Sequence, residues 1–236
     1  MVIRKGISLA LPYYKGRKFI ARSLVSAYED LSIDDEIILI NDGCPEDRDD
    51  IYLLLRELET QLGPAIHYHE INTNRGLVFA LNTALDVACG TYFARLDQDD
   101  VVIPGRFDIQ RSALLAGTAE VSFGRWVIDC PLTGRAASFG RDINDRGNQI
   151  RLRFGNILCH GTFCGKTSLI RSMGGYRVQY QYAEDYDLWL RLMNNRVKFH
   201  FSSTPLIIRG VHPEQMSKRF WRQSYARLMA TFSNIL

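Results

Sequence analysis

The chain has 236 residues, of which 46% are hydrophobic and 23% charged, an ordinary globular composition. It excludes disordered, collagen-like and repeat-solenoid proteins. The 29 basic and 26 acidic residues give a net charge of +3, which is too balanced for a protein that coats nucleic acid, so no nucleic-acid partner is expected. Five cysteines without C-x-x-C spacing predict free thiols and a cytoplasmic location. We expect no membrane-spanning helix, and no signal peptide because Pro12 interrupts the first apolar run.

The first hundred residues alternate between strand-like and helix-like hydrophobic periods. The expected elements, in chain order, are a strand at 7–11, a helix from 19 to at least 27, a strand at 36–40, a helix at 45–62, a strand at 65–71, a helix at 76–88 and a strand at 91–96. This alternation predicts an α/β fold with a parallel, Rossmann-like sheet and right-handed crossovers. In such sheets, ligands bind beyond the carboxyl ends of the strands.

The second half is less regular. Its expected elements are a helix at 104–116, a strand at 121–129, helices at 166–173 and 184–194, and strands at 197–201 and 205–208. Gly174 and Gly175 indicate the end of the helix at 166–173. Arg151 and Arg153 are interpreted as part of a solvated basic strand, with contact to an anionic acceptor as the alternative. No low-complexity linker separates the halves, so one continuous domain is expected over residues 1–217.

A dense acidic segment, Asp97-Gln98-Asp99-Asp100, directly follows an apolar strand. Like charges this close are unfavourable unless a cation neutralises them. Carboxylate oxygens suit Mg²⁺ or Mn²⁺, which commonly bridge carboxylates to a substrate's phosphates. A solvated acidic turn in which Asp100 caps the next helix explains the segment equally well.

Two other strand ends carry candidate binding residues. Asp42, in Asn41-Asp42-Gly43, is placed either near the ribose or base of a nucleotide or in a simple turn. Pro12 and Tyr14 follow the first strand and could line the same crevice. Tyr14 could stack on a base or be an ordinary packed aromatic residue.

The second acidic cluster opens the helix expected at 184–194, where Glu184, Asp185 and Asp187 occupy the first turn. The helix dipole favours acidic residues there, so capping is one explanation. The same dipole would keep Asp185 ionised, as a general base requires.

Together these segments resemble the family 2 glycosyltransferases of the GT-A fold, which are inverting enzymes that use nucleotide-diphosphate sugars. The resemblance covers about residues 3–217, with the pieces in the family's order. They are the opening strand 7–14, the Asp-Asp-Gly-Ser-like segment 38–44, the glycine-led helix 74–82, the D-x-D motif at 97–100, the region 174–189 around the catalytic base, and the segment 208–217. Three residues depart from the pattern: Lys15 replaces the usual Asn, and Asn41 and Cys44 differ within their segment.

The resemblance implies a role for each matching position. Asp42 would contact uracil or another base beside Pro12 and Tyr14, and Arg75 would also bind the substrate. Asp97 would face the ribose or the metal, and Asp99 would bind Mg²⁺ or Mn²⁺ directly. Asp185 would deprotonate the acceptor hydroxyl. His212 would be a metal or diphosphate ligand.

The implied activity is metal-dependent, inverting transfer of a sugar, with a UDP-sugar as the favoured donor, to a hydroxyl of a growing glycan. By resemblance the pathway is bacterial surface polysaccharide, such as capsule or lipopolysaccharide, with a glycan or lipid-linked glycan as acceptor. Residues 1–102 would form the nucleotide-binding half and residues 103–217 the acceptor-binding half. The alternatives are a sugar-nucleotide nucleotidyltransferase, which needs a glycine-rich basic loop after the first strand, and a non-catalytic carbohydrate-binding domain.

The last segment, residues 218–236, is predicted to be an amphipathic helix. Its apolar residues recur every three or four positions at Trp221, Tyr225, Leu228, Phe232 and Leu236, beside basic residues. Packing on its own domain or a homodimer is favoured over contact with an anionic membrane. In the membrane alternative, the protein would be peripheral on the inner face of the membrane.

Overall fold

The computed structural model describes residues 4–60, 63–130 and 135–210, together with 227, 229–231 and 233–234. The strands of this part are β1 (Arg4–Tyr13), β2 (Glu36–Asp42), β3 (Ala65–Ile71), β4 (Gly90–Arg95), β5 (Val101–Val102), β6 (Val121–Cys130), β7 (Arg135–Phe139), β8 (Cys164–Lys166) and β9 (Phe199–Arg209). The helices before the C-terminal segment are α1 (Arg17–Asp30), α2 (Arg48–Glu59), α3 (Leu77–Val87), α4 (Arg106–Leu115), α5 (Arg146–Phe154), α6 (Thr167–Ser172) and α7 (Glu184–Asn194).

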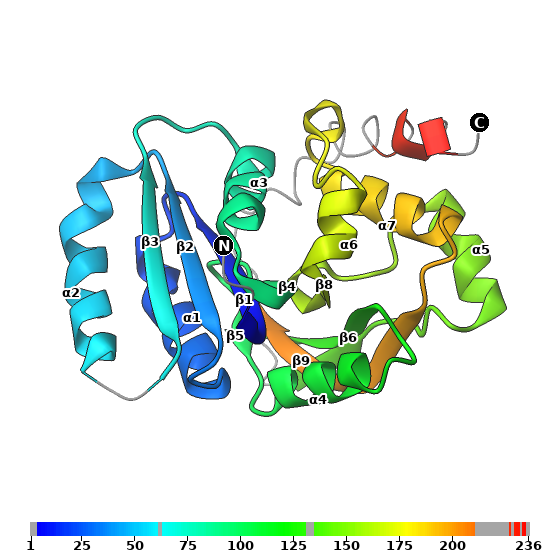
Figure 1. The fold of residues 1–236 in the computed structure, drawn as a ribbon, viewed down its shortest axis with the longest axis horizontal. Helices are drawn as coiled ribbons and strands as arrows, with labels where there is room; N and C mark the ends of the chain where they lie inside the picture. The colour runs from blue at the N-terminus through cyan, green and yellow to red at the C-terminus, as the bar shows by residue number, and fades with distance from the viewer. Residues whose placement is uncertain are drawn as a thin grey trace.

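All of these strands join one curled sheet in the order β3-β2-β1-β4-β8-β6-β9-β5, with β7 on β6 (Figure 1). The first four strands in this order are parallel, as the alternation of strands and helices predicts. β8 then pairs antiparallel with both β4 and β6 and so joins the two halves. The carboxyl ends of β1, β2 and β4 therefore share one edge, beside the second half of the chain.

Each face of the sheet has its own hydrophobic core because successive strand residues point to opposite faces. On one face, Ala10, Ile38 and Phe93 pack with residues of α3, α6 and α7. On the other, Leu9 and Leu39 pack with residues of α1, α2 and α4. Helices thus cover both faces, which explains why residues 37–40 of β2 are apolar throughout.

Three predictions for individual elements need correction. Residues 135–139 and 146–154, expected to be irregular or, around Arg151 and Arg153, a strand, form β7 and α5. The two strands expected at 197–201 and 205–208 are one strand, β9. Its pairing with β6 shifts register opposite Gly124–Trp126, and this irregularity accommodates Pro205 within the strand.

The C-terminal segment is helical at its described positions and packs on α7. Ala230 is fully buried, the hydroxyl groups of Tyr186 and Thr231 are 3.1 Å apart, and Asn234 Nδ2 donates to Asp187 at 3.2 Å. These contacts agree with packing on the chain's own domain. The apolar residues of the predicted stripe lie outside the described residues. Within the described part of the chain, we find no helix with the length and apolarity needed to cross a membrane.

Candidate active site

The segments that follow β1, β2 and β4 lie side by side, so the structure brings Pro12, Tyr14, Asp42 and the acidic segment 97–100 to one edge of the sheet. Pro12 pairs with Ile40 across β1 and β2, and β1 also pairs with β4. Tyr14 is 40% exposed just beyond β1. The side-chain amide of Gln98 holds it on both sides, accepting from Tyr14 N at 2.9 Å and donating to Tyr14 O at 3.0 Å. Gln98 thereby fixes the first loop against the acidic segment.

Asp42 is buried at the end of β2, and its carboxylate binds the loop that precedes α3. It accepts hydrogen bonds from the backbone N–H groups of Arg75 and Gly76, both at 2.8 Å, and from Asn74 Nδ2 at 3.1 Å. Gly43 is required beside it, because its φ is +82° and a Cβ there would lie 2.2 Å from Asn74 N. Asp42 therefore has a structural function that the sequence did not reveal.

Arg75 is exposed in this loop, at the same edge as Asp42. Its guanidinium carbon lies 3.5 Å from the centroid of the Phe79 ring, a stacked cation–π arrangement. The backbone bond to Asp42 and the stack on Phe79 together hold this cation beside the end of β2.

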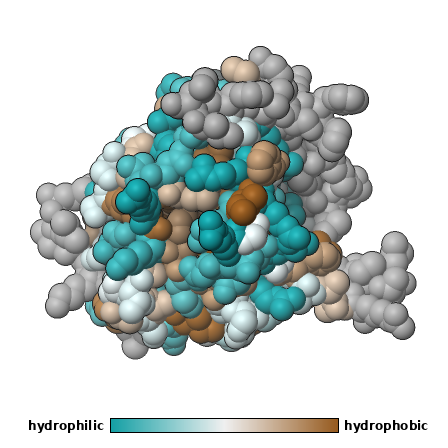
Figure 2. All heavy atoms as spheres, turned by 90° about the vertical axis from the view of Figure 1, so that its right-hand side faces the viewer, coloured by the Kyte–Doolittle hydropathy of each residue, from teal (hydrophilic) through white to brown (hydrophobic). Residues whose placement is uncertain are grey.

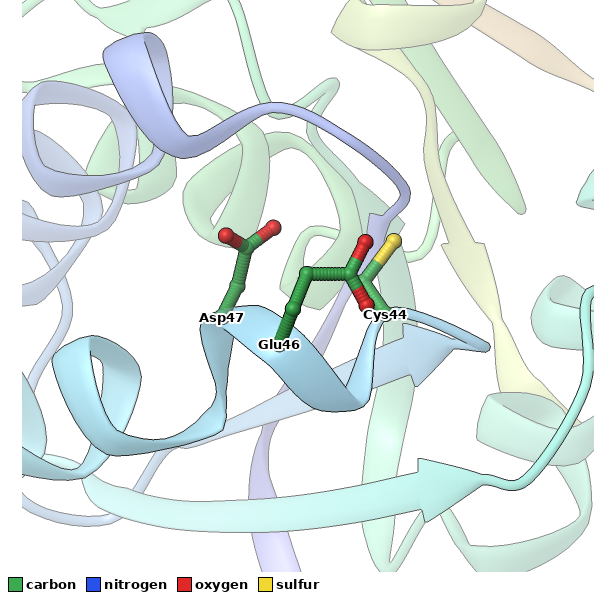
Figure 3. A group of neighbouring side chains, drawn as sticks. All are labelled: Cys44, Glu46 and Asp47. Atoms are coloured by element: carbon green, nitrogen blue, oxygen red, sulfur yellow. The ribbon is translucent and has the colours of Figure 1, made fainter.

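Cys44, Glu46 and Asp47 form another cluster behind this edge, with potential ligand atoms within 4.8 Å of one another (Figure 3). Two of the three are engaged in connecting loops. The Tyr13 hydroxyl donates to Asp47 at 2.5 Å, and Lys15 N donates to Cys44 Sγ at 3.1 Å. Burial also raises the pKa of the Cys44 thiol, which disfavours the thiolate that a metal would need. The cluster is explained by packing between the loops after β1 and β2.

The acidic segment 97–100 combines partial burial with close negative charges. Asp97 forms an ion pair with the buried Arg95. Burial nevertheless raises the pKa of Asp97, and the nearby Asp99 adds to the effect. Asp100 is only 1% exposed, and its pKa is raised well above the usual range by burial and by Asp97 and Asp99. Burial and mutual repulsion thus disfavour full ionisation of the segment, whereas Arg209 favours it at Asp97 and Asp100 and Arg95 favours it at Asp97.

Asp100 also connects the acidic segment to the end of β9. Its Oδ1 accepts from Gly210 N at 3.0 Å, whereas its buried Oδ2 has no hydrogen-bond partner in the described part of the chain. Gly161 leaves the room for this oxygen, since a Cβ there would lie 2.6 Å from Oδ2. Asp100 thus does not act as the simple helix cap that the sequence allowed, because α4 begins only at Arg106.

Arg95, which the sequence analysis did not select, links the acidic segment to α7. Besides pairing with Asp97, its positive charge acts to lower the pKa of Glu184 and of Asp185. Its backbone oxygen accepts from the buried Arg106 guanidinium at 2.8 Å. Nothing in the sequence indicates this link except a charged residue in an otherwise apolar strand, which burial makes costly unless it is paired.

Asp185 lies in the first turn of α7 and is partly buried. Asn156 Nδ2 donates to its Oδ2 at 2.7 Å and Tyr186 N donates to its Oδ1 at 2.6 Å. Burial raises its pKa, while these hydrogen bonds and Arg95 oppose the rise. Neighbouring Glu184 is more buried, and burial together with the Asp185 charge raises its pKa to about 7. Asn156 is a second site residue that the sequence analysis missed.

His160 is buried, at 7% exposure, and lies near Arg95. Its Nε2 lies 3.0 Å from the Tyr176 hydroxyl, and its ring meets Trp189 edge-on at 5.5 Å between centroids. Burial and the nearby Arg95 lower its pKa well below the usual range, so the imidazole is neutral. His212 lies outside the described residues.

The profile of the family described as "Glycosyl transferase family 2" matches residues 8–173. The chain belongs to glycosyltransferase family 2. This result confirms the resemblance carried by the motifs at 7–14, 38–44 and 97–100.

Curated relatives include the putative glycosyltransferase EpsE of Bacillus subtilis, 27% identical over 194 residues that cover 78% of this chain and 66% of the relative. The O-antigen biosynthesis glycosyltransferase WbnJ of Escherichia coli is 28% identical, with 80% and 72% covered. The amylovoran biosynthesis glycosyltransferase AmsE of Erwinia amylovora is 29% identical, with 68% and 58% covered. The chain thus spans between about three fifths and three quarters of these relatives.

Solved structures confirm the GT-A fold. S. aureus TarS, residues 1–349 in complex with UDP, superposes with a TM-score of 0.72 at 17% identity, covering 98% of this chain and 65% of TarS. The mannosyltransferase PcManGT of Pyrobaculum calidifontis, in complex with GDP-Man and Mn²⁺, has a TM-score of 0.69 at 18% identity, covering 98% of this chain and 64% of PcManGT.

Proposed function

We propose that this family 2 protein is a metal-dependent, inverting glycosyltransferase. It would transfer a sugar from a nucleotide-diphosphate sugar, with UDP as the favoured nucleotide, to a hydroxyl of a growing bacterial surface glycan. In this proposal, residues 1–102 form the nucleotide-binding half of the domain and residues 103–217 form the acceptor-binding half. The names of WbnJ and AmsE support the polysaccharide pathway, and the UDP bound to TarS supports the nucleotide.

One observation carries the proposal. The acidic segment after β4 and the Asp185 turn of α7 share one buried cation, Arg95, which acts on Asp97 and on Asp185. The negative charge of Asp185 also contributes to the raised pKa of Asp97, so the two acidic groups influence each other's ionisation. Separate groups to neutralise a leaving diphosphate and to deprotonate an acceptor are what inverting sugar transfer requires.

The donor set fits a divalent cation of the Mg²⁺ or Mn²⁺ type. Asp97, Asp99 and Asp100 offer hard oxygen ligands, and burial together with the neighbouring carboxylates raises the pKa of Asp97 and of Asp100, an effect that a bound cation would oppose. Asp99 is assigned as the direct ligand. We keep His212 as a further ligand because Gly210, two residues before it, donates to Asp100. The cation, when bound, would act as a Lewis acid that stabilises the diphosphate leaving group.

The chain's own residues would perform the proton transfer. Asp185 accepts the proton of the acceptor hydroxyl as that oxygen attacks the anomeric carbon opposite the leaving group, which inverts the configuration. Asn156 holds Asp185 Oδ2 in place, leaving further lone pairs of the carboxylate for the hydroxyl. The raised pKa brings Asp185 closer to the range of an effective base.

Nucleotide recognition is assigned to the loops after β1 and β2. Asp42 accepts three hydrogen bonds and so keeps about one of its roughly four acceptor positions for a base N–H. Tyr14 and Pro12 line the same edge, and the exposed cation of Arg75 would face the nucleotide. Asp97 is placed toward the ribose.

The structure of the first loop weighs against the nucleotidyltransferase alternative. A phosphate cradle needs backbone N–H groups that point at the ligand. In residues 14–18, the N–H of Tyr14 binds Gln98 and that of Lys15 binds Cys44 Sγ. Two of the donors that such a cradle would use are therefore already engaged with neighbouring loops.

The test is turnover of nucleotide sugars with Mn²⁺, preceded by a thermal-shift screen of UDP-, GDP-, CDP- and dTDP-sugars. Bound donor should raise the melting temperature with concentration.

We expect Asp99→Ala to abolish Mn²⁺-dependent turnover and weaken donor binding, whereas Asp86→Ala, at an exposed acid of α3, should preserve both. Unchanged Mn²⁺ dependence in Asp99→Ala would refute the metal assignment. A chain that neither transfers the sugar nor hydrolyses any donor would be a binding module.

A further inference from the structure

Helix α5 presents an apolar ridge to solvent. Ile150 is 53% exposed and Phe154 is 79% exposed, and the two are i,i+4 neighbours on one face of the helix. Leu152, on the opposite face, is fully buried in the core that also contains Trp189. The helix is therefore anchored through one residue while its largest side chain points away from the protein.

Arginines flank this ridge on both sides. At 100° per residue, Ile150 and Phe154 lie 40° apart, with Arg146 and Arg153 to one side and Arg151 to the other. All three arginines are exposed, and α5 contains no acidic residue. The two acids just before it bind the turn instead, since Asp142 accepts from Asn144 N and Asp145 from Asn148 N.

No ion pair to these three arginines is formed within the described residues. Figure 2 looks onto this side of the molecule and shows apolar patches within a mostly hydrophilic surface. An apolar centre between cations is the pattern of a helix that lies in the headgroup region of a bilayer.

We propose that the outward face of α5 docks on an anionic lipid bilayer, with Ile150 and Phe154 entering the interface and Arg146, Arg151 and Arg153 contacting lipid phosphates. This surface is separate from the C-terminal segment, whose described part packs on α7. It also lies next to the candidate active site, because Asn156, the hydrogen-bond donor to Asp185, follows α5 after one residue.

The charge and size of the face favour a bilayer over a second copy of the chain. In a two-fold contact whose axis passes through α5, three arginines would face three arginines with no carboxylate of the helix to pair with them. The helix is only nine residues long, about 14 Å. The outward face of so short a helix is much smaller than the roughly 800 Å² that each partner buries in a stable interface. A bilayer supplies both the phosphates and the apolar phase.

The experiment is co-sedimentation of the full chain with vesicles of phosphatidylcholine, with or without phosphatidylglycerol, at low and high salt. It needs no donor or acceptor, so its outcome is independent of the transferase proposal. We expect binding to the anionic vesicles at low salt and weaker binding at high salt. Binding to both vesicle types alike, or to neither, would overturn the proposal.

Two variants of α5 then locate the surface. Ile150→Ser with Phe154→Ser, and separately Arg151→Glu with Arg153→Glu, should each weaken vesicle binding by about tenfold or more. The matched controls are Leu115→Ser, 65% exposed on α4, and Arg56→Glu, exposed on α2, which should bind like the parent chain.

Melting temperatures within about 2 °C of the parent would show that the substituted surface residues leave the fold intact. Vesicle binding that survives both α5 variants would refute docking through this helix. A parent chain that is dimeric by light scattering, and monomeric in Ile150→Ser with Phe154→Ser, would instead show that the face is a protein interface.

Discussion

The carboxyl ends of β2 and β4 both carry buried aspartates, yet the protein treats them differently. At β2, the Asp42 carboxylate accepts three hydrogen bonds from the loop before α3. At β4, Asp100 accepts one from Gly210 and leaves its other oxygen without a partner in the described part of the chain. Burial raises the pKa of Asp97 and Asp100 there.

The difference separates an acid whose carboxylate is held by donors of the fold itself from acids whose proposed ligand is a cation. Backbone donors stabilise an ionised carboxylate without any external charge. The three neighbouring carboxylates Asp97, Asp99 and Asp100 repel one another although Arg95 pairs with Asp97, and a bound cation would relieve this repulsion. Substitution of Asp42 should therefore lower the stability of the fold, whereas substitution of Asp100 should not.

The largest effect is expected at the candidate base. Asp185→Asn should lower kcat by about 10²-fold or more, because the amide cannot accept the acceptor's proton, while donor affinity stays close to that of the parent. Steady-state kinetics with donor titration measures both quantities. Asp86→Asn, at an exposed position, is the control and should leave kcat unchanged. An unchanged kcat in Asp185→Asn would move the base to another acid of α7.

Asp42→Ala should lower the free energy of unfolding by about 2–3 kcal/mol, because the N–H groups of Arg75 and Gly76 lose their acceptor. Urea denaturation measures the change.

The matched substitution at the other strand end is Asp100→Asn. It retains an oxygen for Gly210 N and removes a buried carboxylate, so without metal its stability should equal or exceed that of the parent. Equal destabilisation by the two substitutions would contradict the distinction between the strand ends.

The pH dependence of stability should report on Glu184. Its pKa is about 7 in the folded protein, above the value of about 4.3 for an unfolded chain. The folded state therefore holds its proton more tightly, and that stabilisation is complete below about pH 4.3 and is lost as the pH rises through 7. Glu184→Gln should reduce the fall in unfolding free energy across this window by about 1–3 kcal/mol.

Asp97, Asp100 and Asp185 also have raised pKa values, so the variant should retain part of the slope. Urea titrations at several pH values compare the two chains. Identical slopes in the parent and in Glu184→Gln would show that Glu184 does not titrate in this range.

The smallest effect concerns Lys15, which stands where the family pattern has Asn. Its φ is +52°, in the left-handed region where Asn is tolerated better than Lys. Lys15→Asn should raise the free energy of unfolding by about 0.5 kcal/mol. Lys18→Asn, at an exposed position inside α1, should instead lower it by a few tenths, because Asn is the poorer helix former. A loss of stability in Lys15→Asn would show that the lysine side chain itself holds the loop.

The sequence by itself determined the parallel half of the fold. The strands β1 to β4 and the helices between them follow from local periodicity, and the acids at their ends follow from the expected parallel order. Local patterns suffice there because the inner strands β1, β2 and β4 are largely buried and each crossover is short in sequence. The D-x-D motif and the Asp185 turn are also recognisable in the sequence, but only as separate segments.

Only the tertiary structure decided how those segments work together. Arg95 pairs with Asp97 and also acts electrostatically on the first turn of α7, almost ninety residues later in the sequence, a distance at which no periodicity operates. The carboxylate of Asp42 accepts hydrogen bonds from a loop thirty-odd residues later in the sequence. Asn156, in an irregular segment, donates a hydrogen bond to Asp185. The ridge of α5 was likewise hidden, because exposed Ile150 and Phe154 break the rule that apolar residues point inward. Local sequence encodes the elements, whereas charge pairing and exposure depend on which distant residues fill the space around them.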